Sequence, residues 1–216
     1  MGLLVRELGT CPYGAVLALQ EELVSRKIDG DQNDYLLVLE HEPVYTLGRG
    51  ANAADLLGAD AALGIPSYRI GRGGGVTFHG PGQLVAYPIL TLAHCHDVHR
   101  FVHALEEVLI RTCAAFTITG RRHDGLTGVW VADAKIASIG IGVRRWTTFH
   151  GVALNVSTDL RYFSHVVPCR MPDVRMTSMA LELGTVPALA EVRTTFITTF
   201  RSVFGYPEAA VEECRV

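Results

Sequence analysis

Residues 71–83 hold six glycines within thirteen residues and read GRGGGVTFHGPGQ. Glycine loses more backbone entropy on folding than any other residue, so we expect no regular element here, but main chain that turns sharply or approaches a ligand closely. Backbone N–H groups in such a loop can hold an anion or a carbonyl oxygen. Arg72, Thr77, His79 and Gln83 interrupt the glycines, unlike in a flexible Gly/Ser linker. The segment therefore predicts a binding loop, and a plain surface loop is the alternative.

Cys169 and Lys135 are candidates for covalent and proton-transfer chemistry. Cys169 lies in VVPCRMP, where two prolines restrict the backbone and Arg170 supplies a cation. The thiolate is the reactive form of cysteine and a nearby positive charge favours it, so Cys169 is a candidate nucleophile; the alternative is a small core residue. Lys135 begins the apolar segment KIASIG. From residue type alone we expect its ammonium to reach water at the strand end, unless it is held for a task.

Metal and nucleotide sites are less well supported. Five potential zinc ligands gather before and within a predicted helix: His94, Cys95, His96, His99 and His103. His99 and His103 occupy polar helix positions, so a solvated face is the preferred interpretation and we expect no metal. No GK[ST] follows the glycines, which argues against a phosphate-binding loop. Residues 48–53 match GxGxxA, but no acidic residue follows at the spacing that a dinucleotide site needs.

The elements that must position these residues follow from hydrophobic periodicity. Apolar residues at helical spacing predict helices over 14–27, 97–115 and 187–204. Short apolar runs predict strands over 3–8, 35–39, 44–47, 83–90, 129–131, 136–143 and 149–156. Only turns separate the last three, which predicts an antiparallel meander, and Pro88 predicts an edge strand or a bulge. The predicted class is α/β or α+β, with a mixed, largely antiparallel sheet flanked by helices.

Length and composition limit the class of protein. The chain has 216 residues, of which 49% are hydrophobic and 19% charged, with a net charge of −3. This predicts one globular domain, residues 1–216, and no nucleic-acid partner. We expect no membrane span, since no apolar run is long enough, and no secretory signal, since the first apolar run is short. Five cysteines without C-x-x-C spacing predict reduced thiols in a cytoplasmic protein, with Cys113 buried and inert in a helical stripe.

Several motifs together resemble one family, the octanoyl-acyl carrier protein:protein N-octanoyltransferases of lipoate biosynthesis. Residues 72–83 meet the family pattern RGGxxT[YF]HGPGQ in full. Further segments are similar to family motifs: residues 39–48 (LEHEPVYTLG), 128–131 (GVWV), 135–140 (KIASIG), 149–156 (FHGVALNV), Pro168-Cys169 and 174–179. The resemblance covers about residues 3–204. It implies a fold similar to that of the biotin and lipoate protein ligases.

The resemblance implies a two-step acyl transfer with no metal and no cofactor. Cys169 would attack the thioester of octanoyl-acyl carrier protein and form a thioester acyl-enzyme. Lys135 would favour the thiolate and later take a proton from the attacking amine. The acyl site would comprise Arg72, Gly73, Gly74, Gly75, Val76, Thr77, Phe78 and His79, with Ser138, Ile139 and Gly140, and with Gly151, Val152 and Ala153. Backbone N–H groups of the last two segments would stabilise the tetrahedral oxyanion.

The implied acceptor is a lysine of a lipoyl domain, in the E2 subunits of 2-oxoacid dehydrogenases or in the glycine cleavage H protein. This chain has Arg170 where the family usually has glycine. Arginine would be strained there if the position needs a positive φ, and its cation could instead lower the pKa of Cys169 further or meet an acidic carrier. Other arginines are candidates for carrier docking or for a solvated surface: Arg121, Arg122, Arg144, Arg145 and Arg175. The alternatives are an ATP-dependent lipoate or biotin ligase, a non-catalytic acyl- or carrier-binding protein, and a cysteine hydrolase that pairs Cys169 with His79 or His150.

Overall fold

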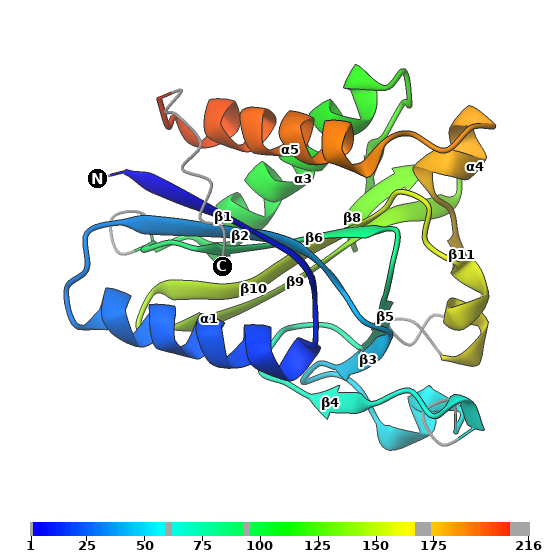
Figure 1. The fold of residues 1–216 in the computed structure, drawn as a ribbon, viewed down its shortest axis with the longest axis horizontal. Helices are drawn as coiled ribbons and strands as arrows, with labels where there is room; N and C mark the ends of the chain where they lie inside the picture. The colour runs from blue at the N-terminus through cyan, green and yellow to red at the C-terminus, as the bar shows by residue number, and fades with distance from the viewer. Residues whose placement is uncertain (1, 59–61, 93–95, 167–173, 208–216) are drawn as a thin grey trace.

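The main sheet has eight strands and lies between layers of helices (Figure 1). The structure is a computed structural model that describes residues 2–58, 62–92, 96–166 and 174–207. Seven strands follow the order β1-β2-β6-β10-β9-β8-β7, and β11 pairs with β9. Their bounds are Leu3–Cys11 (β1), Asp34–His41 (β2), Gln83–Ile89 (β6), Arg121–His123 (β7), Leu126–Val131 (β8), Ala134–Arg144 (β9), Thr147–Asn155 (β10) and Arg175–Met176 (β11). The pairs β1–β2 and β9–β11 are parallel and the others antiparallel, so the predicted sheet is confirmed.

A second, three-stranded sheet with the order β4-β3-β5 lies at the lower right of Figure 1. Its strands are Val44–Leu47 (β3), Ser67–Arg69 (β4) and Val76–His79 (β5). Strand β5 corrects the expectation that the glycine-rich segment contains no regular element. Val76 and Phe78 are residue types that favour strands, and both are buried in one apolar cluster with Tyr45 of β3. Only residues 71–75 of the glycine-rich segment precede this strand as an irregular loop.

Helices cover both faces of the main sheet (Figure 1). Helices α3 (Val98–Ala115) and α5 (Leu189–Phe204) pack together on one face, and α1 (Tyr13–Ile28) covers the other. The three predicted helices are thus confirmed. The short α4 (Met179–Leu183) and the 3₁₀ turns Ala53–Leu56 (η1) and Leu160–His165 (η2) were not predicted. Within the described residues, none of these helices combines the length and the apolar character that crossing a bilayer requires.

Polar contacts hold the ends of the helices in the fold. Asp97 caps α3 by accepting a hydrogen bond from the N–H of Arg100 at 2.8 Å. At the C-terminal end of α1, Lys27 Nζ lies 2.9 Å from Asp34 Oδ1, and both side chains are buried. The Tyr206 hydroxyl, just beyond α5, donates to Asp34 Oδ2 at 2.6 Å. This buried cluster joins α1, β2 and the segment after α5.

Strand β6 lies inside the main sheet, between β2 and β10, so the prediction of an edge strand at Pro88 is wrong. Pro88 has no N–H to donate. His150, the residue of β10 opposite Pro88, turns into the left-handed region with φ +57 and donates its N–H to Gln20 Oε1 at 2.8 Å. Thr148 Oγ1 donates to Pro88 O at 2.8 Å and accepts from the N–H of Leu90 at 2.9 Å. The irregularity that the proline requires is therefore in the neighbouring strand.

Candidate active site

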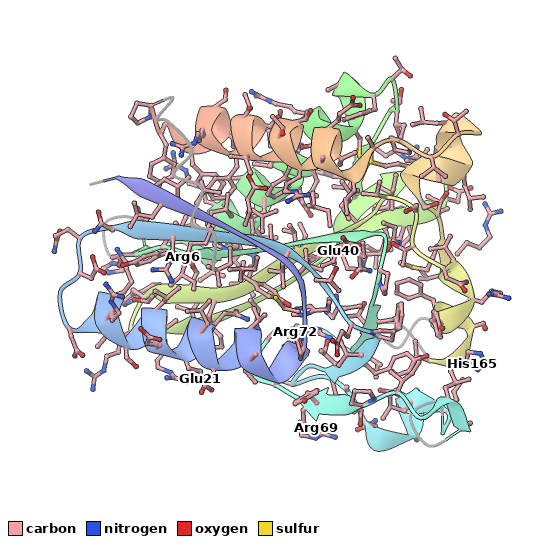
Figure 2. The ribbon with its side chains drawn as sticks, in the orientation of Figure 1. Arg6, Glu21, Glu40, Arg69, Arg72 and His165 are labelled. Carbon is pink, nitrogen blue, oxygen red and sulfur yellow. The ribbon has the colours of Figure 1, made fainter. Side chains whose placement is uncertain are left out.

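A pocket opens between the small sheet, the N-terminal end of α1 and strands β9 and β10. Its empty volume, open mouth included, is about 670 Å³. The predicted site residues that line it are Arg72, Gly74, Val76, Thr77, His79, Lys135, Ser138, Ile139, Gly140, Gly151, Val152 and Ala153. Figure 2 shows Arg72 beside the N-terminal end of α1. Gly73, Gly75 and Phe78 are not among the lining residues, and Phe78 stacks on Tyr162 instead.

A β-bulge places Lys135 on the pocket side of β9. Val129 pairs with Ala137 but Trp130 pairs with Lys135, so Ile136 is an extra residue in β9. Residues two apart in a regular strand share a face, and a bulge breaks this rule. Ala137 packs in the core beneath α3 and α5, whereas Lys135 lines the pocket. Lys135 is only 4% exposed, so the prediction that its ammonium reaches water at the strand end is wrong.

The side chain of Lys135 lies across strand β8. Its Nζ is 5.5 Å from the centre of the Trp130 ring, within the range of a cation–π contact. A Cβ on Gly128 would lie 2.6 Å from Lys135 Cε and 3.3 Å from Nζ, and Gly128 has φ +124. Glycine at this position therefore leaves the space that the lysine occupies.

A buried carboxylate on α3 holds Gly128 in place. Glu106 Oε1 accepts the N–H of Gly128 at 3.2 Å, and Oε2 accepts Arg122 Nε at 3.2 Å and lies 3.0 Å from His103 Nδ1. Sequence reasoning gave Glu106 no place in the acyl site; the available signal was its position beside the apolar stripe of α3. His99 and His103 are exposed, which confirms the predicted solvated face.

The glycine-rich loop surrounds the side chain of Arg72. Its Nη2 donates to Thr46 O at 2.8 Å and to Thr46 Oγ1 at 3.0 Å, and its Nη1 donates to Gly73 O at 2.9 Å. A Cβ on Gly140 would lie 2.8 Å from Arg72 Cδ, and one on Gly48 would lie 2.8 Å from Nη1. The two glycines thus allow the arginine to lie between β9 and the loop after β3, where it is 7% exposed.

The HGPGQ motif connects the small sheet to the main sheet through side-chain hydrogen bonds. His79 Nδ1 lies 2.8 Å from Gln83 Oε1, Gln83 Nε2 donates to Asn155 Oδ1 at 2.9 Å, and Asn155 Nδ2 donates to Thr177 O at 3.0 Å. The N–H of Thr177 donates to Lys135 O at 3.0 Å, so the network reaches the backbone of the lysine. Burial lowers the pKa of His79 to about 3, which keeps the ring neutral.

The pocket is also lined by three polar rings that the sequence analysis did not assign to the acyl site, those of Tyr13, Tyr87 and His150. The Tyr87 hydroxyl lies 2.7 Å from His41 Nε2, and His41 Nδ1 lies 3.0 Å from Cys11 O. By contrast, the Tyr13 hydroxyl and both ring nitrogens of His150 have no hydrogen-bond partner among the described residues. Burial lowers the pKa of His41 and of His150 to about 4 and raises that of Tyr13, so all three are neutral.

The two described cysteines are not lining residues of the pocket. Cys113 is buried in α3 as predicted, and burial raises its pKa to about 12, which disfavours the reactive thiolate. Cys11 donates its S–H to Leu8 O at 3.1 Å. The candidate nucleophile Cys169 lies outside the described residues and stays a prediction, and the same holds for His94, Cys95, Arg170 and Cys214.

The chain also resembles known proteins in sequence. Residues 12–201 match the family described as Lipoyl protein ligase A/B catalytic domain. An octanoyltransferase of Rubrobacter xylanophilus is 46% identical over 204 residues, which cover 92% of each chain. An octanoyltransferase of Thermosynechococcus vestitus is 47% identical over 200 residues, which cover 92% of this chain and 88% of the other.

Solved structures show the same fold at low sequence identity. A putative lipoate protein ligase from T. acidophilum has a TM-score of 0.80 at 17% identity and covers 96% of this chain and 87% of its own. A lipoate-protein ligase A bound with ATP has a TM-score of 0.79 at 18% identity, covering 99% and 90%. The biotin protein ligase of Aquifex aeolicus has a TM-score of 0.56 at 12% identity, covering 95% and 70%. By its fold and by the sequences of its relatives, the chain belongs to the lipoyl protein ligase A/B family, within the group of octanoyltransferases.

Proposed function

We propose that this protein transfers an octanoyl group from octanoyl-acyl carrier protein to a lysine of a lipoyl domain, with residues 1–216 acting as one catalytic domain. The observation that carries the proposal is the buried Lys135, which the bulge in β9 turns into a pocket with largely apolar walls. These walls suit an acyl chain and are formed by Ile70, Val76, Ile139, Val152, Phe163, Val174 and Met176, among others. The relatives named octanoyltransferase support the same activity.

In the first half-reaction, the thiolate of Cys169 attacks the carbonyl carbon of the octanoyl thioester. The new carbon–sulfur bond to Cys169 forms, the bond to the carrier's sulfur breaks, and the carrier leaves as a thiol after taking a proton from the Lys135 ammonium, which leaves Lys135 neutral. The ammonium of Lys135 favours the attacking thiolate by charge pairing. Phe163 and Val174, on either side of residues 167–173, line the same pocket as Lys135, which supports this role for Cys169.

In the second half-reaction, the amine of a lipoyl-domain lysine attacks the acyl-enzyme. The carbon–nitrogen bond forms, the bond to Cys169 breaks, and the attacking amine loses a proton. Lys135 in its neutral form accepts this proton. Its position supports that role, because Lys135 is buried and lines the pocket.

Both half-reactions pass through a tetrahedral oxyanion. Gly140 and Gly151 face each other in the β9–β10 ladder, where N–H groups serve strand pairing. Gly74 lines the pocket with φ +85, and no hydrogen bond found among the described residues uses its N–H. We therefore infer that the N–H of Gly74, rather than those of the strand residues that the resemblance implied, stabilises the oxyanion.

Arg175 is the arginine best placed to meet an acidic carrier protein. It is exposed, and it lies between Val174 and Met176, which both line the pocket. Arg121 pairs with Asp133, and Arg122 pairs with Glu106 and Glu107, so their charges are partly used within the protein. In the second half-reaction, the acceptor is a lipoyl domain of a 2-oxoacid dehydrogenase E2 subunit or of the glycine cleavage H protein.

The reaction needs no nucleotide, because the thioester already carries the activation of the acyl group. A cytoplasmic setting fits this chemistry, since a reactive thiol persists in a reducing compartment. The thiols of Cys11 and Cys113 are likewise free.

The test is the intact mass of the protein after mixing with octanoyl-acyl carrier protein. We expect the wild type and the control Cys11→Ser to gain one octanoyl group that hydroxylamine removes, and Cys169→Ser to gain none. Lys135→Ala should slow acylation by roughly 10² to 10⁴. A lipoyl domain added afterwards should discharge the acyl-enzyme.

Each of three outcomes would overturn the proposal. One is a wild type that neither gains mass nor passes an octanoyl group to a lipoyl domain. Another is transfer that survives in Cys169→Ser, which would exclude the cysteine acyl-enzyme. Transfer that proceeds from free octanoate, and only when ATP is added, would likewise overturn the proposal and would indicate a ligase.

A further inference from the structure

The bulge that turns Lys135 into the pocket also determines which side chain of β8 lies opposite it. Val129 pairs with Ala137, so a regular ladder would place Ile136 opposite the next residue of β8. With the bulge, Trp130 pairs with Lys135 instead. Side chains directly opposite each other in an antiparallel pair lie on one face of the sheet, close enough to interact.

The charged end of Lys135 lies over the Trp130 ring. Nζ is 5.5 Å from the ring centre, and the two residues are 4% and 3% exposed. The face of an aromatic ring is negative and attracts a cation within about 6 Å. An ammonium that is shielded from water loses hydration, and the ring face replaces part of that stabilisation.

The indole N–H of Trp130 does not hold the ring in place. It is buried and has no hydrogen-bond partner among the described residues. An unpaired buried donor costs folding free energy, and buried tryptophans usually pair theirs. A tryptophan is therefore expected here for its ring face, over which Lys135 Nζ lies.

We propose that Trp130 is a positioning residue for acyl transfer, whose ring holds the ammonium form of Lys135 over its face. This inference rests on the proposed function, in which Lys135 gives a proton to the departing carrier and takes one from the acceptor amine. The attraction is present while Lys135 is charged and absent while it is neutral. Trp130 thus stabilises the resting enzyme and favours the proton uptake that restores it after each transfer.

The other pocket groups around Lys135 keep their charge at and above neutral pH. Burial lowers the pKa of His79 and of His150, so both rings are neutral. Burial raises the pKa of Tyr13 and of Tyr87, so both hydroxyls stay protonated. Arg72 stays a cation throughout.

The groups outside the pocket wall call for two control backgrounds. Glu106 lies behind Gly128 and pairs with Arg122, and Arg175 is exposed in β11. Above neutral pH, carboxylates and guanidinium groups do not titrate. The exposed ring of His123 lies 5.4 Å from that of Trp130, so His123→Gln is one background. A thiol ordinarily titrates in this range, so Cys169→Ser is the other.

The measurement is the titration of Lys135 by NMR, with lysine isotopically labelled at Cε. The sequence has two lysines, so the spectrum holds two signals, and Lys135→Ala assigns them. We expect the titration midpoint of Lys135 to fall by roughly 0.5 to 1.5 pH units in Trp130→Leu, and by less in Trp130→Phe. Lys27 is the internal control, because its ammonium is paired with Asp34, and its signal should not respond.

Fluorinated tryptophan separates the charge of the ring face from the packing of the ring. In Trp146→Phe, which replaces a 40% exposed ring, Trp130 is the one tryptophan of the chain. This background alone should leave the Lys135 midpoint in place. Fluorine withdraws electrons from the ring face and changes its size little, so each added fluorine should lower the midpoint further. These proteins decide the matter if Trp130→Leu does not fold.

The alkaline limb of the single-turnover acylation rate should move with the midpoint, and a limb that stays in place would overturn the role in transfer. His123→Gln and Cys169→Ser should preserve the response of the midpoint to the Trp130 ring. The same midpoint with ordinary and with fluorinated tryptophan would show that Trp130 only packs against the lysine. A wild type that transfers octanoyl groups while the midpoint ignores the ring refutes this inference alone; a wild type that transfers none refutes the proposed function.

Discussion

At the Lys135 end of the pocket, a supporting carboxylate is fully engaged: Glu106 accepts hydrogen bonds through both oxygens and holds Gly128 beneath the lysine. At the other end the backbone of His150 is held as firmly, but its ring and the Tyr13 hydroxyl have no hydrogen bond among the described residues. Both ends are buried, so burial alone does not distinguish them.

Under the proposed mechanism, the difference reflects two requirements on one pocket. A group that moves protons must be in place before the substrate arrives, so its supports are paired within the protein. A group that recognises a ligand must keep its hydrogen-bonding capacity for that ligand. The two ends can therefore be separated by variants that affect one of them alone.

The largest effect is expected from Gly128→Ala. The new methyl group would lie 2.6 Å from Lys135 Cε, at a residue with φ +124. We expect acylation to slow by roughly 100-fold and the free energy of unfolding to fall by about 3 kcal/mol. The measurements are single-turnover acylation and urea unfolding. Gly30→Ala is the control, since Gly30 has φ +107 and open space around it; it should lose about 1 to 2 kcal/mol and no acylation rate. Equal acylation in both variants would contradict the role of Gly128.

Glu106→Gln should have the next largest effect. The amide keeps one acceptor for the N–H of Gly128 but loses the charge that pairs with Arg122. We expect a loss of about 2 to 3 kcal/mol in unfolding free energy and slower acylation. Glu107→Gln should cost below about 1 kcal/mol, because the Glu107 side chain is 32% exposed and its ion pairs are screened by water. Similar losses in the two variants would show that the buried carboxylate has no special part.

Acid should destabilise the fold through its buried histidines. The pKa values of His41 and His150 are about 4 and that of His79 is about 3, all below the ordinary 6.5. Between pH 6.5 and these lower pKa values, the unfolded chain binds more protons than the folded chain. The contribution of the neutral histidines to stability is therefore complete above pH 6.5 and falls as the pH falls towards 4. Each histidine should cost about 2 kcal/mol at pH 5.

The check is the free energy of unfolding at pH 7.5 and pH 5. His150→Asn should flatten this pH dependence, and the exposed His99→Gln should not. The same slope in both variants would show that His150 is not held neutral in the folded protein.

The smallest effect, and the one of opposite sign, is expected from Tyr13→Phe. The Tyr13 hydroxyl is buried and has no partner among the described residues. Its removal should leave the free energy of unfolding unchanged or raise it by up to about 1 kcal/mol, which a melting curve will show. Tyr45→Phe should lower it by about that amount, because Tyr162 O then loses its donor. An equal loss in both would show that the Tyr13 hydroxyl is already paired, and the contrast between the two ends would disappear.

Local patterns predicted the elements well because their causes are local. The apolar stripe of α3 and the capping Asp97 lie within one segment, and so do the β-branched and aromatic residues of the meander. The prediction of an edge strand at Pro88 was wrong because its cause is not local. The strand partner that allows a proline inside the sheet is His150, with Gln20 taking its N–H, and neither is near Pro88 in sequence.

The site was predictable where motifs carry it and not where the fold assembles it. The glycine-rich loop and Lys135 were singled out from composition and resemblance. The bulge at Ile136 is a property of strand register, and the residue types near it do not predict it. Tyr13 and His150 are more than 130 residues apart and line one pocket only because α1 packs on the main sheet, so their common location could not be derived from either segment.

The buried cluster of Lys27, Asp34 and Tyr206 has a consequence for biosynthesis. Asp34 and Tyr206 are 172 residues apart, so the second carboxylate oxygen has no hydroxyl donor until residue 206 has left the ribosome. At about 5 to 20 residues per second, that interval is roughly 10 to 35 s. The nascent chain therefore completes this corner only after α5 has been synthesised, because the residue that completes it lies just beyond that helix, which closes the core over the main sheet.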